Sequence, residues 1–241
     1  MADELPALDR IAEPQRTAIR QYVGLIRDVA GDRAKGLVLF GAIAAGTFDP
    51  KRHTVKNLLI LDEVDLSILR RLAAHGPKLG RQRISAPVVM TPDYIRSSAD
   101  TFPLELIEIQ QMHLTLFSEV SFDDLTFQDG HVRLQCEREL KALLIGLRQG
   151  LLASAGEEKF IGVLEVELGE ALIRTLRGML WLKGQRQAKP ALEVVAEIEK
   201  LTKRDLPGLR TALNAAATHG WEQFESLYTD VAALAEAVDG W

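Results

Sequence analysis

The chain has 241 residues, a formal net charge of −5 and 26% charged residues, an ordinary composition for a globular protein. Its uncharged apolar stretches fall short of the ~18 to 20 residues that a membrane helix requires, which argues against a membrane partner. Neither half has the basic excess that is typical of proteins binding duplex nucleic acid. The first residues lack the apolar segment of a secretory signal, so the expected location is cytoplasmic.

The distribution of prolines divides the chain into two parts with different sequence patterns. Seven of the nine prolines lie at or before Pro103, and none occurs between Pro103 and Pro190. After Asp129, leucines recur at the three- and four-residue spacing of helices. We therefore expect an α/β domain over residues 1–128 and a helical bundle domain over residues 129–241.

The first part alternates predicted helices and strands. Apolar residues at helical spacing predict a helix over 12–31. Continuous apolar runs, the first of them bounded by glycines, predict buried strands over 36–41 and 55–61. The mixed pattern at 104–109 is interpreted as a strand, followed by a helix over 110–117. The other elements expected here are a helix over 65–74, a strand over 87–91 and a short helix over 95–99.

The second part is predicted to be entirely helical. The helix expected over 158–183 is apolar over too wide an arc for a surface helix, so we expect it to be the central one. Trp181, Trp221, Phe224 and Tyr228 are expected to fill the core, while the terminal Trp241 is a candidate for an exposed docking surface. The five helices are predicted over 130–152, 158–183, 190–201, 205–216 and 221–238.

A glycine-bounded loop follows the first strand. Residues 40–46 read FGAIAAG, and two turns of small residues there allow backbone amides to face an anion. This segment resembles the signature loop of the minimal nucleotidyltransferases, which include DNA polymerase beta and the aminoglycoside nucleotidyltransferases. That loop reads Phe-Gly-Ser-x-Ala-x-Gly and precedes a strand of the form Ser-Asp-x-Asp-Leu-Leu-Val. The strand here reads TVKNLLI at residues 54–60.

The resemblance implies an α+β fold, a nucleotidyltransferase-like mixed sheet with flanking helices, followed by an all-α helical bundle. In that family the loop serine helps to hold a triphosphate, and the strand aspartates bind two magnesium ions together with an acid from a later strand. The corresponding positions here are Ala42, Val55, Asn57 and Glu105. Valine offers no ligand and asparagine only a neutral oxygen, whereas hard divalent ions need several anionic oxygens. The chain therefore carries vestigial positions at Val55, Asn57 and Glu105, and we expect no metal site.

These departures favour a degenerate nucleotidyltransferase fold, without metal-dependent nucleotidyl transfer, that acts as a nucleotide-binding or protein-interaction module. The expected nucleotide-binding residues are Gly41, Ala42, Gly46 and Lys56, with Lys51 or Arg52 supplying further charge.

Two alternatives stay open. One is an active nucleotidyltransferase that holds magnesium through the non-standard ligands Asn57 and Glu105, with Asp62 or Asp49. The other is a pure interaction protein that binds a protein partner or a second copy of itself through an exposed apolar patch.

Other motifs carry weaker signals. The loop also matches most of the P-loop pattern, but Thr47 occupies the position of the phosphate-binding lysine. A simple tight turn is a further alternative. The acids Asp62, Glu63 and Asp65 could form a displaced metal site, although the favoured interpretation is a cap on the next helix. Arg210 and His219 are too far apart in sequence for the paired residues of helical ribonucleases, so RNA cleavage is not supported. The other histidines are scattered without metal-ligand spacing, and the lone Cys136 is expected to be a packing residue.

Overall fold

The computed structural model describes residues 6–214 and 217–241. The chain divides into two compact units, each with a hydrophobic core of its own. The first unit comprises Met1–Ala99 and Glu108–Thr126, and the second comprises Asp100–Ile107 and Phe127–Trp241. None of the helices in the described part of the chain combines the length and apolar character needed to cross a membrane.

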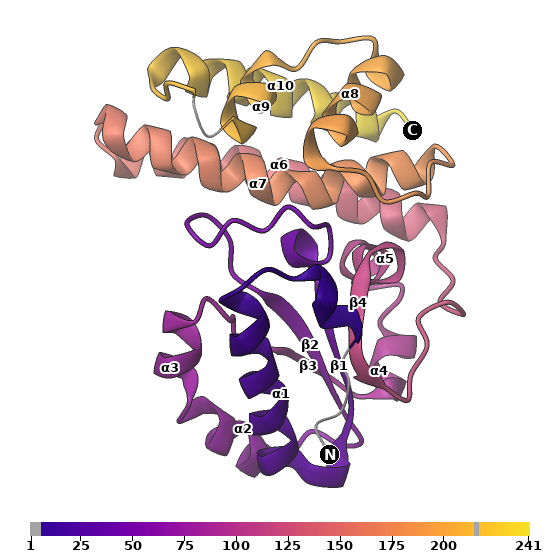
Figure 1. Ribbon diagram of the computed structural model, residues 1–241. Helices are drawn as coiled ribbons and strands as arrows, with labels where there is room; N and C mark the ends of the chain where they lie inside the picture. Colours follow the sequence, from indigo (N-terminus) through magenta and orange to yellow (C-terminus); the bar gives the residue numbers. More distant parts are fainter. Residues whose placement is uncertain (1–5, 215–216) are drawn as a thin grey trace. The chain divides into compact units, whose positions relative to one another are not determined.

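A four-stranded mixed sheet forms the centre of the first unit (Figure 1). Its strands are β1 (Ala34–Phe40), β2 (Lys56–Leu61), β3 (Val88–Met90) and β4 (His113–Ser118), in the order β3-β2-β1-β4. Strand β1 pairs antiparallel with β2 and β4, whereas β2 and β3 run parallel. The central strands β1 and β2 are almost wholly buried, which explains their continuous apolar sequence.

Helix α1 (Gln15–Ala30) covers one face of this sheet. Its buried residues Ile19, Tyr22 and Ile26 belong to the same core as the inward-facing leucines of β1 and β2. The helix ends at Gly31, as the sequence predicted, where a positive φ of 55° favours glycine. The other helices are α2 (Leu66–Ala73), α3 (Gly76–Arg81) and α4 (Pro92–Ser97), with short 3₁₀ turns η1 (Pro6–Arg10), η2 (Gly31–Arg33) and η3 (Gly41–Ile43).

The prediction for residues 104–117 was wrong, because helix and strand occur in the opposite order. Helix α5 (Pro103–Gln111) comes first and strand β4 follows it. Pro103 is well suited to a first helical turn, where its missing N–H costs nothing. Leu104, Leu106, Ile107 and Ile109 are all buried, so the helix lacks the one-sided apolar stripe by which helices are recognised. Helix α3 was also missed, because His75-Gly76-Pro77 was interpreted as a stop.

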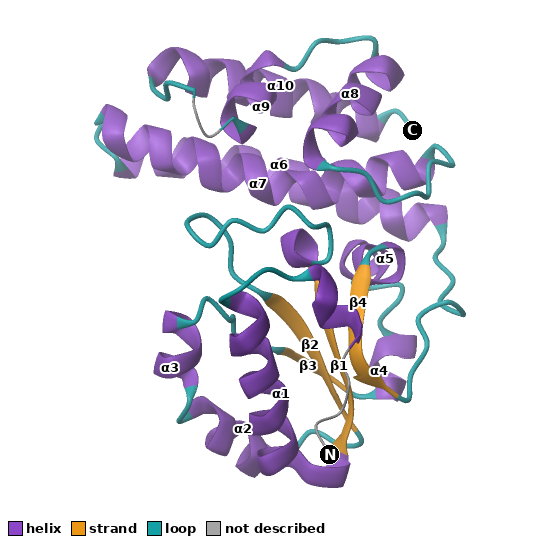
Figure 2. Ribbon diagram, viewed as in Figure 1, coloured by secondary structure: helices purple, strands orange, loops and turns teal. Residues whose placement is uncertain are grey.

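Five helices make up most of the second unit (Figure 2). They are α6 (Asp129–Ala153), α7 (Glu158–Leu182), α8 (Ala191–Thr202), α9 (Pro207–Leu213) and α10 (Trp221–Asp239). The predicted central position of α7 is confirmed, since it packs against all four other helices. Helix α9 is shorter than the predicted 205–216, and residues 215–216 lie outside the described residues.

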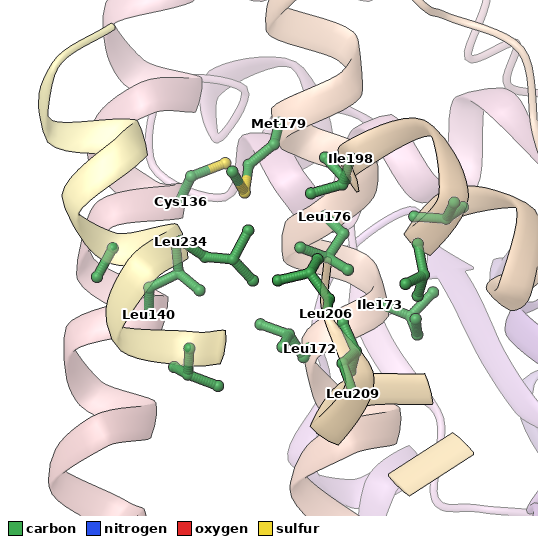
Figure 3. Packing of buried hydrophobic residues seen from close by; sticks show 14 of the residues in the cluster. Cys136, Leu140, Leu172, Ile173, Leu176, Met179, Ile198, Leu206, Leu209 and Leu234 are labelled. Carbon is green, nitrogen blue, oxygen red and sulfur yellow. The ribbon is translucent and has the colours of Figure 1, made fainter. Parts of the chain in front are cut away.

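Aliphatic side chains make up most of the core of the second unit, and Figure 3 shows part of it. Leu172, Leu176 and Met179 of α7 lie among side chains from α6, α8 and α10. Cys136 packs there as predicted, and burial raises the pKa of its thiol to about 12, so the group is not a reactive thiolate. Trp181 and Phe224 are buried as expected, but Trp221 is 44% exposed, so the prediction that it fills the core was wrong.

Candidate functional site

The glycine loop, residues 41–46, leaves β1 in a tight helical turn. Gly41 and Gly46 both have a φ of 71°, a conformation that side chains on Cβ disfavour. The turn is closed by hydrogen bonds from the amides of Ala44 and Ala45 to the carbonyl of Gly41. The backbone at both ends of the loop therefore adopts a conformation that favours glycine.

Lys56 lies directly beside this loop. It is the first residue of β2 and pairs with Phe40, the last residue of β1. Its aliphatic stem covers Gly41 so closely that a Cβ added to Gly41 would lie 3.2 Å from Cδ of the lysine. Lys56 as a whole is an exposed residue, so this lysine brings a positive charge to the surface beside the loop.

Val55 occupies the first vestigial position and is fully buried in the core of the first unit. Its backbone forms an isolated parallel bridge with Ile84. The carbonyl of Val55 accepts hydrogen bonds from the N–H and the hydroxyl of Ser85, and the N–H of Val55 donates to the carbonyl of Arg83. The side chain therefore serves packing, and the backbone ties the start of β2 to the segment before β3.

Asn57 occupies the second vestigial position and is only 1% exposed. Its Oδ1 accepts a 2.8 Å hydrogen bond from the hydroxyl of Tyr22, and its Nδ2 donates to the carbonyls of Ser85 at 3.0 Å and Val55 at 3.3 Å. Burial raises the pKa of the Tyr22 phenol, which keeps it a hydrogen-bond donor. The hydrogen bonds of this buried asparagine thus link α1, β2 and the segment before β3.

Glu105 lies in the first turn of α5 and belongs to the second unit, whereas the glycine loop belongs to the first. Its Oε1 forms an ion pair with Nη1 of Arg174 at 3.1 Å, and its Oε2 accepts a hydrogen bond from Gln135 at 2.8 Å. Gln135 in turn accepts the backbone N–H of Leu104. The prediction that Glu105 lies on a strand was wrong, and its described contacts are those of a residue that fastens α5 to α6 and α7.

The acids after β2 bind a single arginine. Asp62, Glu63 and Asp65 all form ion pairs with Arg33, at 3.1, 3.4 and 2.9 Å. Asp65 also accepts the backbone N–H of Ser67 at 2.7 Å and caps α2, as predicted. The hydrogen bond from Ser67 holds the pKa of Asp65 below its ordinary value. Within residues 6–214 and 217–241, no group of three or more His, Cys, Asp or Glu is placed to hold a metal ion.

The segment between the loop and β2 is held by hydrogen bonds among His53, Arg83 and Asp49, the last of which the sequence offered as an alternative magnesium ligand. Nδ1 of His53 accepts the backbone N–H of Asp49 at 2.9 Å, and Nε of Arg83 donates to the carbonyl of His53 at 3.1 Å. The carboxylate of Asp49 accepts the backbone N–H of Lys51. These contacts position Lys51 and Arg52 on the turn that leads into β2.

Comparisons with known proteins bear on the fold. No family model matches the chain, and no curated protein matches its sequence. Among solved structures, it is similar to spectinomycin adenyltransferase AAD(9) from Enterococcus faecialis with ATP and spectinomycin. The TM-score is 0.61 at 8% sequence identity, over 92% of this chain and 98% of that one.

The chain has a nucleotidyltransferase-like fold. The predicted α+β class, a mixed sheet with flanking helices followed by C-terminal helices, is confirmed. At 8% identity the likeness shows the fold alone, and it transfers neither the activity nor the ligands of the adenyltransferase.

Proposed function

We propose that this nucleotidyltransferase-like fold lacks metal-dependent nucleotidyl transfer and acts as a nucleotide-binding module, with a protein-interaction role as the second possibility. The observation that carries the proposal is the side chain of Asn57. Its Oδ1 accepts the hydroxyl of Tyr22, and its Nδ2 donates to the carbonyls of Ser85 and Val55. Because this side chain is 1% exposed and held in the core, it is poorly placed to serve as the ligand of a catalytic ion at the loop.

The chemistry that would be lost is that of paired metal ions. In two-metal phosphoryl transfer, carboxylates hold the ions that activate the attacking hydroxyl and neutralise the leaving group. Val55 supplies no oxygen, and Lys56 adds a positive charge next to the position where the cations would bind. Hard divalent ions require several anionic oxygens. The start of β2 therefore disfavours metal binding, because it lacks such oxygens and carries a positive charge.

Phosphate binding requires fewer specialised side chains than the binding of divalent metal ions does. Small turns expose backbone amides to an anion, and one positive side chain can supply the remaining attraction. The glycine loop is a small turn of this kind, with Gly41 and Gly46 at positive φ and Lys56 packed over Gly41, and in this proposal the amides at its start, around Gly41 and Ala42, face the phosphate. Lys51 and Arg52 would add charge from the following turn. In this proposal a nucleotide binds without magnesium, and Lys56 takes part of the role that a metal would have.

Calorimetric titration with ATP and GTP, with and without magnesium, tests the proposal. Lys56→Met is the informative variant, because methionine keeps the packing over Gly41 while removing the charge. Lys78→Met, on the exposed surface of α3, is the matched control. We expect magnesium-independent binding that Lys56→Met weakens by about tenfold, the effect of one charge-assisted phosphate contact, and that the control retains.

Two other outcomes would overturn the nucleotide-binding proposal in favour of its alternatives. Absence of binding for both nucleotides would leave an interaction module, whose protein partner or homodimer would be sought by sedimentation of the purified chain. Magnesium-dependent transfer of labelled nucleotide would instead favour an active enzyme using Asn57 and Glu105 with Asp62 or Asp49. In the structure, Glu105 binds Arg174, Asp62 binds Arg33, and Asp49 accepts the backbone N–H of Lys51.

A further inference from the structure

Helix α9 does not cap its own N-terminus. The N-cap position is Leu206, which has no polar side chain, and Pro207 has no N–H to donate. The first backbone N–H groups of a helix have no partner within the helix and require acceptors from elsewhere when they are buried. In this seven-residue helix, those acceptors come from two neighbouring helices.

Two carboxylates hold the start of α9. Glu199 of α8 accepts the N–H of Leu206 at 2.9 Å and also binds the guanidinium of Arg210 through both of its oxygens. Asp230 of α10 accepts the N–H of Leu209 at 2.9 Å, and the nearby N–H of Gly208 acts on the same carboxylate. The start of α9 is thus held by Glu199, which is paired with an arginine, and by Asp230, whose partners in the described part of the chain are backbone amides.

The second carboxylate is enclosed by tight packing. The backbones of α9 and α10 touch at Gly208, where an added Cβ would lie 2.1 Å from the backbone nitrogen of Leu227. Asp230 itself is 5% exposed. Among the described residues, no cation contributes to the electrostatics of Asp230. A buried carboxylate in that setting is disfavoured in its charged form, and undocking of α9 would return this group to water.

We propose that Asp230 is a proton-responsive anchor of α9, so that mild acidification strengthens the docking of α9 on α10 and ionisation weakens it. The charged groups on the neighbouring helices fit this role. Glu199 of α8 adds negative charge, whereas Arg210 of α9 is committed to Glu199. Several other charged groups on these helices have partners of their own: Arg148 of α6 donates to Tyr228, Lys141 of α6 pairs with Asp239, and Arg204 after α8 pairs with Glu236 of α10.

The sign of the pH dependence follows from the direction of the shift. Burial raises the pKa of Asp230 from 3.8 to about 6, against the lowering effect of the hydrogen bonds from Leu209 and Gly208. The docked form therefore binds more protons than the undocked form between these two values. Docking is strongest below this window, weakens as the pH rises through it, and is constant above about pH 7.

Amide hydrogen exchange of Leu209, corrected for its intrinsic rate, measures this docking in the full chain. We expect the protection of this amide to be about tenfold higher at about pH 5 than at about pH 7.5. Asp230→Asn keeps a carbonyl acceptor for both amides and should abolish the pH dependence. Glu222→Gln, an exposed acid in the first turn of the same helix, is the control and should retain it.

Equal protection of Leu209 at both pH values in the unsubstituted chain, or an unchanged pH effect in Asp230→Asn, would overturn the proposal. If the variant does not fold, carboxyl carbon NMR on the unsubstituted protein decides the matter. The Asp230 carboxyl and the Leu209 amide should then titrate together with a midpoint near 6. A midpoint in the range of ordinary aspartates, with no response at Leu209, would refute the anchor.

Discussion

The side chain of Asn57 has a structural role in the core, at a position where the resembled family has a metal-binding aspartate. Its amide makes three hydrogen bonds in the core, to partners from three segments of the first unit. Sequence reasoning identified Asn57 as a poor metal ligand, but it could not find Tyr22, which lies 35 positions away. A tyrosine within the apolar stripe of α1 was a signal that a buried polar partner was needed.

Removing the hydroxyl of Tyr22 tests the importance of this network. Tyr22→Phe keeps the ring but leaves Oδ1 of Asn57 buried without its donor, so we expect the free energy of unfolding to fall by about 1 to 3 kcal/mol. Urea denaturation measures the change. Tyr94→Phe, whose side chain is 49% exposed, should stay within about 0.5 kcal/mol of the unsubstituted protein. Equal effects of the two substitutions would show that the buried hydrogen bond adds nothing.

Restoring an acid at position 57 should not restore a metal site. In Asn57→Asp, an anionic oxygen replaces the Nδ2 donor and faces the carbonyls of Ser85 and Val55 in the core. We expect a loss of stability of about 3 to 5 kcal/mol at neutral pH, because a charge is buried without a cation. The loss should shrink in acid, where the protonated carboxyl can donate again. Thermal unfolding across pH and a magnesium titration check both points, and tight magnesium binding would contradict this account of position 57.

Among the elements, the glycine loop depends on glycine for its backbone conformation at Gly41 and Gly46. Gly41→Ala should lower the free energy of unfolding by about 1 to 2 kcal/mol, because alanine disfavours a φ of 71°. The new Cβ also presses on Lys56 and should weaken nucleotide binding. Gly24→Ala is the matched control, since this glycine is exposed within α1 with nothing within 4 Å of an added Cβ. That change should stabilise the protein by up to about 1 kcal/mol. Similar denaturation midpoints for both variants would contradict the conformational argument.

Elements were predictable where one local pattern dominated. Strands β1 and β2 are continuous apolar runs, and the long helices of the second unit carry leucines at regular helical spacing. Helix α5 and strand β4 were exchanged because both faces of α5 are buried, which leaves no periodicity to distinguish it. The partners of Glu105 were out of reach for a different reason. Gln135 and Arg174 are distant in sequence, and only tertiary structure brings them to α5.

At the scale of the whole molecule, the two hydrophobic cores lie in different compact units. A residue buried in one core stabilises the contacts of that core directly, so a substitution there should act first on its own unit. Tyr22 belongs to the core around β1 and β2, whereas the fully buried Leu176 belongs to the core around α7. The pair therefore allows each unit to be weakened separately.

Hydrogen exchange followed by mass spectrometry can read out both units in one experiment. Tyr22→Phe should raise exchange in peptides from β1 and β2, while peptides from α6, α7 and α10 keep their protection. Leu176→Ala, which removes about 2 to 5 kcal/mol through the cavity it leaves, should produce the opposite pattern. Local loss of protection would mean that each core sets the stability of its own unit. A uniform loss across the chain in both variants would mean that the two units unfold as a single cooperative body, despite their separate cores.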